Sequence, residues 1–219
     1  MAINEAAFVE LKKELDEKNI TLIAVSKKKS AEEILQLYHL GQRDFGENYV
    51  QELIEKRPQL PQDIRWHFIG HLQRNKVKQI IPFISLIQSI DSVALLKEVA
   101  KQAKKIDRPV DCLLQVFVAD EETKYGFDPE EIIPVLHEIS NNENEFVNIK
   151  GLMGMASFTE DEKKIRHEFK QLNSLYQDVK KRDREFQFLS MGMSGDYKIA
   201  IEENSNMVRI GSLIFGERN

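Results

Sequence analysis

The sequence predicts an α/β protein: a single (β/α)8 TIM barrel that spans residues 1–219 and carries an extra N-terminal helix. Three observations support this fold class. Short apolar runs alternate with longer amphipathic stretches, there are eight such runs, and no Pro-, Gly- or Ser-rich linker divides the chain. Alternation of this kind is typical of parallel βαβ units, and eight is the strand count of the closed barrel.

The expected elements follow from hydrophobic periodicity. The opening helix contains Ala6, Phe8, Val9, Leu11 and Leu15 near helical spacing. Runs that read as strands cover residues 21–26, 43–46, 66–70, 86–90, 111–118, 149–154, 186–191 and 207–210. Segments with helical spacing cover about 31–40, 47–57, 72–81, 92–105, 129–141, 160–182 and 196–203.

Start signals support several of these helices. Ser30 and Glu33 are spaced as a capping box, Asp91-Ser92 marks the start of the helix expected over 92–105, and Pro129 stands at a first helical position.

An open doubly wound sheet is the competing architecture. It would more often place a glycine-rich turn after its first strand, where this chain has Lys27-Lys28-Lys29-Ser30. The barrel is therefore favoured.

Composition excludes several classes of protein. Hydrophobic residues make up 42% of the chain and charged residues 31%, which allows a sizeable core. A net charge of −5 argues against nucleic-acid binding driven by bulk charge. Cys112 is the only cysteine, so no internal disulfide can form. We expect no membrane segment, no signal peptide, a cytoplasmic location and a monomer.

Lys27 ends the first apolar run, Thr21–Ser26, and therefore lies at the carboxyl end of the first strand. Barrel active sites lie at these strand ends. Partial desolvation there would favour the neutral amine, which attacks aldehydes to form a Schiff base. A solvated lysine that merely closes the strand is the ordinary alternative.

Two turns of small residues follow the seventh and eighth strands. Gly192-Met193-Ser194-Gly195-Asp196 precedes a helix, and Gly211-Ser212 follows the last strand. Both offer backbone N–H groups and hydroxyls to an anion, and phosphate sites recur at this place in barrels. Ordinary helix capping and an ordinary strand exit are the alternatives.

Arg209 lies inside an apolar strand, where an unpaired guanidinium is costly. It either faces outward or pairs with a carboxylate, or it points into the barrel mouth at a ligand. An arginine donates hydrogen bonds and does not accept them. His67 and His71 are four residues apart but straddle a strand end, so we expect no metal site.

Six motifs occur in order along the chain. They are Ala24-Val25-Ser26-Lys27, Phe45 to Glu52, His67-Phe68-Ile69-Gly70 with Leu72-Gln73 and Asn75-Lys76, Gly151-Leu152-Met153, Ser190 to Ser194 and Met207 to Gly211. Together they resemble the YggS/PROSC family of pyridoxal phosphate homeostasis proteins. The resemblance runs from about residue 21 to Gly216 and implies the barrel of fold-type III pyridoxal phosphate proteins, related to the N-terminal domain of alanine racemase.

The resemblance implies a role for each candidate residue. Lys27 would hold pyridoxal 5′-phosphate (PLP) as a Schiff base, and Arg209 would face the pyridine nitrogen. The phosphate cradle would be Ser194, Gly211 and Ser212. Asn48 would lie near the ring or its 3′-oxygen, and Lys124 falls at a position that handles cofactor transfer in relatives.

The function implied by the resemblance is PLP binding for intracellular homeostasis and delivery, with apo PLP-dependent enzymes as recipients and no residue in a catalytic role. A PLP-dependent amino-acid racemase is the alternative. Racemases of this fold also need an acid/base opposite the lysine from an additional domain, which we do not expect because the chain ends at Asn219. A cofactor-free barrel enzyme acting on sugar phosphates would explain the phosphate turns but not Lys27 together with Arg209.

Overall fold

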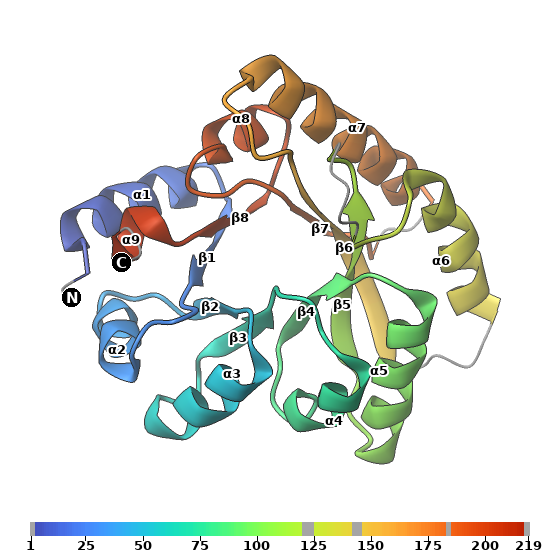
Figure 1. Cartoon of the computed structure of the whole chain (residues 1–219), viewed down its shortest axis with the longest axis horizontal. Coiled ribbons are helices and arrows are strands. Elements are labelled where there is room, and N and C mark those ends of the chain that lie inside the picture. The colour runs from blue at the N-terminus through green and yellow to red at the C-terminus, as the bar shows by residue number, and fades with distance from the viewer. Residues whose placement is uncertain (1–2, 120–124, 142–145, 183–184, 217–219) are drawn as a thin grey trace.

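Eight parallel strands close into a barrel in which each strand lies beside its sequence neighbours and β8 pairs with β1 (Figure 1). The structure is a computed structural model that describes residues 3–119, 125–141, 146–182 and 185–216. The strands are β1 (Thr21–Val25), β2 (Asp44–Glu47), β3 (Arg65–Phe68), β4 (Leu86–Ile90), β5 (Val110–Phe117), β6 (Val147–Met155), β7 (Phe188–Ser190) and β8 (Met207–Ile210). The predicted TIM barrel is thereby confirmed.

Helices surround the strands on the outside of the barrel (Figure 1). They are α1 (Glu5–Glu17), α2 (Ala31–His39), α3 (Val50–Lys56), η1 (Arg57–Gln59), η2 (Arg74–Lys76), α4 (Val77–Ile80), α5 (Val93–Lys105), η3 (Pro129–Glu131), α6 (Ile132–Asn141), α7 (Glu162–Lys180), α8 (Tyr197–Glu202) and α9 (Ser212–Phe215). The extra helix α1 lies beside α9, and the Asn4 N–H donates to the Ile214 carbonyl at 2.8 Å. Within the described ranges, no helix is long and apolar enough to cross a membrane.

The predicted strand boundaries agree with the structure to within two residues, and the Ser30–Glu33 capping box is present. Two expected helices differ. The helix expected over 47–57 begins at Val50, because Glu47 still pairs with Phe68 as part of β2. The segment 72–81 holds only η2 and α4. The short helix α9 was not expected, because four residues show no helical period.

Two apolar clusters divide the core between the outside and the inside of the barrel. The larger one packs the sheet against its helices. The smaller one contains Ile23, Leu86, Leu113, Met153 and Met207, one residue from each of five strands. Because side chains alternate along a strand, these five identify the positions that face the barrel interior.

Candidate functional site

Lys27 lies at the carboxyl end of β1, as the sequence predicted. The Ser26 N–H donates to the Gly46 carbonyl at 2.9 Å, so the ladder between β1 and β2 continues to the residue before Lys27. Ile23 faces the barrel interior, β1 ends at Val25, and Lys27 lies in the turn that follows the strand. The half-buried Lys27 side chain therefore belongs to the barrel mouth.

A buried ammonium group supports the turn that carries Lys27. Lys56 Nζ donates to the Ser26 carbonyl and to Glu47 Oε1, each at 2.9 Å. Ser26 Oγ donates to the same Glu47 oxygen at 2.7 Å. Glu47 is fully buried, and burial raises the pKa of its carboxyl group even though the Lys56 ammonium and the Ser26 hydroxyl oppose this.

The other side of the turn is held by Glu52. Its Oε2 accepts from Lys56 Nζ at 2.8 Å and from the Lys28 N–H at 2.7 Å. Burial opposes ionisation, but these hydrogen bonds lower the pKa of Glu52 overall. Lys28 has a φ of 61°, a left-handed conformation that is uncommon for residues other than glycine. Thus Lys56 and Glu52 fix the backbone both before and after Lys27.

Asn48 follows β2 and carries a buried oxygen that no described residue satisfies. Its Oδ1 has no hydrogen-bond partner among the described residues. Gly70, after β3, packs directly on Asn48, because a Cβ at Gly70 would lie 2.3 Å from the Asn48 carbonyl oxygen. Unpaired buried acceptors are rare and costly, so Asn48 Oδ1 is suited to accept a hydrogen bond from a ligand.

The two small-residue turns meet beside β1. The Gly211 N–H donates to Ser194 Oγ at 3.2 Å. Ser212 begins α9, whose first N–H groups have no carbonyl partner within the helix. The register Ala24↔Ile210 places this pair of turns next to the strand that leads to Lys27. Hydroxyl and N–H groups therefore gather beside the strand that leads to Lys27.

Arg209 points into the barrel and is 4% exposed. Its Nη1 donates to Ser190 Oγ at 2.7 Å and to the Ser190 carbonyl at 2.9 Å, and Nη2 donates to the Gly154 carbonyl at 2.9 Å. Burial lowers the pKa of Arg209 to about 10, and the charge of Asp196 opposes this shift. Arg209 therefore remains a cation and a pure donor at neutral pH.

The neighbouring lysines lie apart from Lys27. Lys28 is exposed, and Lys29 Nζ donates to the Phe215 carbonyl at 3.0 Å and lies 3.6 Å from a Glu33 oxygen. The charge of Lys29 is thus offset by a carboxylate and directed at α9. Lys124 lies outside the described residues.

A cavity of 610 Å³ at this end of the barrel is lined by none of the predicted residues. It lies among the loops after β3 and β4, where His71 Nδ1 is 2.8 Å from Asp91 Oδ2. His67, by contrast, lies inside the barrel. No group of three His, Cys, Asp or Glu side chains in the described part of the chain could hold a metal ion.

Sequence reasoning missed Lys56 and Glu52 as parts of the site. Their spacing of four residues on α3 is visible in the sequence and predicts a helix-surface ion pair. Their contacts with Ser26 and Lys28 join segments 30 and 24 residues apart, so no local pattern reports them.

Comparison with known proteins places this geometry in context. The profile of the family "Alanine racemase, N-terminal domain" matches residues 5–219. A pyridoxal phosphate homeostasis protein of Pasteurella multocida is 37% identical over 93% of this chain and 88% of its own length. The protein of the same name from Aquifex aeolicus is 40% identical, covering 90% of this chain and 86% of its own, and the human one is 38% identical, covering 90% and 76%.

Solved structures agree with these sequence matches. PipY of Synechococcus elongatus, solved with PLP bound, superposes with a TM-score of 0.85 at 32% identity and covers 96% of this chain and 99% of its own. Alanine racemase of Clostridium difficile gives a TM-score of 0.76 at 16% identity, covering 97% of this chain and 57% of its own. The racemase likeness shows the shared fold alone.

Proposed function

The chain belongs to the family of pyridoxal phosphate homeostasis proteins, and from this we propose that it binds PLP and serves in intracellular PLP homeostasis. In this proposal Lys27 holds the cofactor as a Schiff base, and the protein delivers it to apo-enzymes. The homologues' names and the PLP bound to PipY support PLP as the ligand.

The residues present fit the cofactor. An aldehyde needs an amine, and Lys27 supplies one at the mouth. A phosphate needs hydroxyl and N–H donors, which Ser194, Gly211 and Ser212 supply in one sector. Asn48 contributes a buried oxygen that accepts from no described residue, and it could serve the ring substituents.

Arg209 bears on how strongly a bound PLP ring could withdraw electrons, and racemases of this fold tolerate an arginine at this position. PLP supplies a reactive aldehyde and a ring that withdraws electrons most strongly when its nitrogen is protonated. An arginine at that nitrogen can only donate a hydrogen bond and so leaves the nitrogen unprotonated. Arg209 would therefore hold the ring in place while weakening its capacity as an electron sink.

One observation carries the proposal: the register Ile23↔Arg209 between β1 and β8. It places the arginine beside the strand that ends at Lys27, and it places the turn at Gly211 one step further toward the mouth. The amine, the donor for the ring and the Gly211-Ser212 part of the phosphate cradle thus follow or lie on two adjacent strands, and Ser194 after β7 completes the cradle.

The test is the visible absorption spectrum of the purified protein with PLP, before and after borohydride reduction. We expect a Schiff-base band in the wild type, with reduction attaching the cofactor to Lys27 in a peptide mass map. Lys27→Ala should lack the band, and Lys29→Ala, whose amine is directed at α9, should keep it.

Other outcomes decide against parts of the proposal. A wild-type protein that shows no band with excess PLP would refute cofactor binding. Steady racemisation of an amino acid that is abolished by Lys27→Ala would instead identify the racemase alternative. Transfer of PLP to an apo-enzyme faster than its release into buffer would support delivery.

A further inference from the structure

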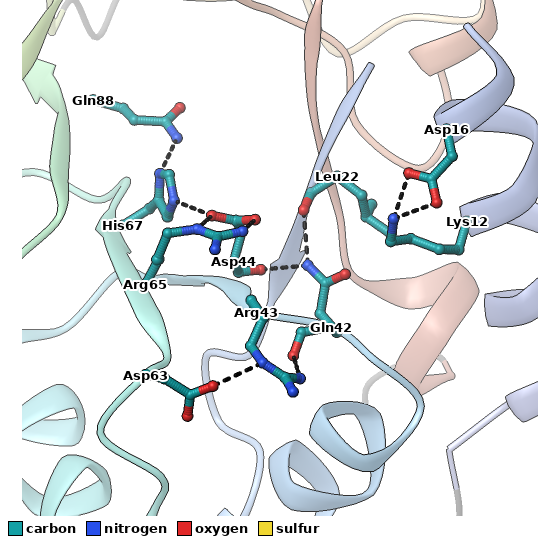
Figure 2. A network of polar contacts seen from close by, with 10 residues as sticks. All are labelled: Lys12, Asp16, Leu22, Gln42, Arg43, Asp44, Asp63, Arg65, His67 and Gln88. Atoms are coloured by element: carbon teal, nitrogen blue, oxygen red, sulfur yellow. Dashed lines mark hydrogen bonds and ion pairs between the residues drawn. The ribbon is translucent and has the colours of Figure 1, made fainter. Parts of the chain in front are cut away.

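A line of hydrogen bonds crosses the barrel interior from Arg209 to the amino-terminal ends of the strands. Arg209 Nη1 donates to Ser190 Oγ at 2.7 Å, and Ser190 Oγ donates to Gln88 Oε1 at 2.7 Å. Gln88 Nε2 lies 3.2 Å from His67 Nδ1, and His67 Nε2 lies 3.0 Å from Asp44 Oδ1. Figure 2 shows Gln88, His67 and Asp44 in a row.

The chemistry of the groups gives this line one direction. An amide nitrogen only donates, so His67 Nδ1 must accept from Gln88 and the ring proton lies on Nε2, which donates to Asp44. Arg65 anchors the far end: its Nε and Nη2 donate to the two Asp44 oxygens at 2.7 and 2.5 Å (Figure 2). Every donor along the line therefore points from Arg209 toward Asp44.

Burial makes the direction hard to reverse. Ser190 and Gln88 are 0% exposed and His67 is 5% exposed, so water does not compete for these contacts. Turning the Gln88 amide over would set its NH2 against the Ser190 hydroxyl and its oxygen against His67 Nδ1. That arrangement needs a second proton on His67 and a new acceptor for the Ser190 hydroxyl.

We propose that Gln88 is a positioning residue for Arg209. It acts through Ser190, whose hydroxyl it orients so that the oxygen lone pair faces the guanidinium. Arg209 uses three of its five N–H groups on Ser190 and Gly154, and the other two donate to no residue in the described part of the chain. The inference deepens the proposed function, because the ligand of those two groups is the PLP ring.

The first test needs no cofactor. In the apo-protein we measure 15N NMR signals of the Arg209 guanidinium and of the His67 ring in the wild type, Gln88→Met and Leu86→Met. Leu86 faces the interior two positions earlier on β4 and takes no part in the line, which makes it a matched control. We expect slow guanidinium rotation and a proton on His67 Nε2 in the wild type, faster rotation in Gln88→Met, and no change in Leu86→Met.

The second test measures PLP affinity and the position of the absorption maximum. Gln88→Met and Ser190→Ala should each weaken PLP binding by about tenfold, since each removes a link to a charged group. Both should shift the absorption maximum. Ser190→Thr, which keeps the hydroxyl, should restore both values, and Leu86→Met should match the wild type.

Gln88→Glu separates the contact with Ser190 from the contact with His67. It still accepts from Ser190 but cannot donate to His67, so we expect unchanged Arg209 signals and a second ring proton on His67. Unchanged Arg209 signals and unchanged PLP affinity in folded Gln88→Met, or in Ser190→Ala if Gln88→Met does not fold, would overturn the positioning role. A wild type that shows the ordered Arg209 signals but does not bind PLP would refute the proposed function instead.

Discussion

The ammonium group of Lys56 donates a hydrogen bond to the main-chain carbonyl of Ser26 at 2.9 Å, across 30 residues of sequence. Ser26 directly precedes Lys27, so a cation on α3 holds the end of β1. The same cation is bound by Glu47 and Glu52, and Glu52 also accepts from the Lys28 N–H. Lys27 thus stands on a turn whose backbone is fixed from outside the barrel.

Removing Lys56 should therefore destabilise the protein. Lys56→Met leaves the Glu47 carboxylate buried without its counter-ion, and we expect the free energy of unfolding to fall by about 3 kcal/mol in urea denaturation. The double variant Glu47→Gln/Lys56→Met removes the uncompensated charge and should recover part of this loss. Equal stability of Lys56→Met and the wild type would show that the cluster holds nothing in place.

Gly70 should tolerate no side chain. A Cβ there would lie 2.3 Å from the Asn48 carbonyl oxygen and 2.7 Å from its Cα, so Gly70→Ala must displace the loop after β2. We expect Gly70→Ala to lose about 2 kcal/mol of stability and to weaken PLP binding. Gly195→Ala is the control for stability, because a Cβ there meets nothing within 4 Å. Thermal unfolding of both variants measures the difference in stability, and PLP titration of Gly70→Ala measures the loss of binding. Equal losses of stability in the two variants would contradict the steric explanation.

Asp44 should make stability depend on pH in the acid range. Burial alone would raise its pKa, but hydrogen bonds from His67 and Arg65 lower it from 3.8 to about 2. A carboxyl group with a lowered pKa in the folded state stabilises the protein above pH 3.8 and loses that effect as the pH falls toward 2.

The measurable consequence is a gap between the wild type and Asp44→Asn. We expect Asp44→Asn to be less stable by about 2 kcal/mol at pH 6, and the gap to shrink as the pH approaches 2. Urea unfolding across this range measures it. A gap that stays constant with pH would assign the loss to packing and not to the carboxylate charge.

Cys112 should be unreactive in the folded protein. Its side chain is fully buried within β5, and burial raises the pKa of the thiol far above its ordinary value. Because the thiolate is the reactive form, we expect a disulfide reagent to modify Cys112 only in denaturant. Rapid labelling of the native protein would contradict this burial.

Most of the fold could be predicted from the sequence because its determinants are local. The alternation of short apolar runs with amphipathic segments identified the eight strands, and the spacing of Ser30 and Glu33 marked the start of α2. Glu47 was assigned to a helix because its neighbours in sequence suit one. Pairing with β3 overrode that local preference.

The candidate residues divide in the same way. The sequence alone determined which chemical groups follow each strand: an amine at Lys27, an amide at Asn48, and small residues at Ser194, Gly211 and Ser212. These positions are set by where each apolar run ends, and a run is a one-dimensional feature of the chain.

Only the tertiary structure decided how these groups are held. The support of Ser26 by Lys56, and of Arg209 by Ser190 and Gln88, joins side chains up to 102 residues apart. Closing the barrel brings them into contact, and burial then requires each polar group to find a partner there. Contacts that form when the barrel closes leave no period or spacing in the sequence. The sequence therefore predicted the amine of Lys27, but it could not predict the side chains that support the backbone around it.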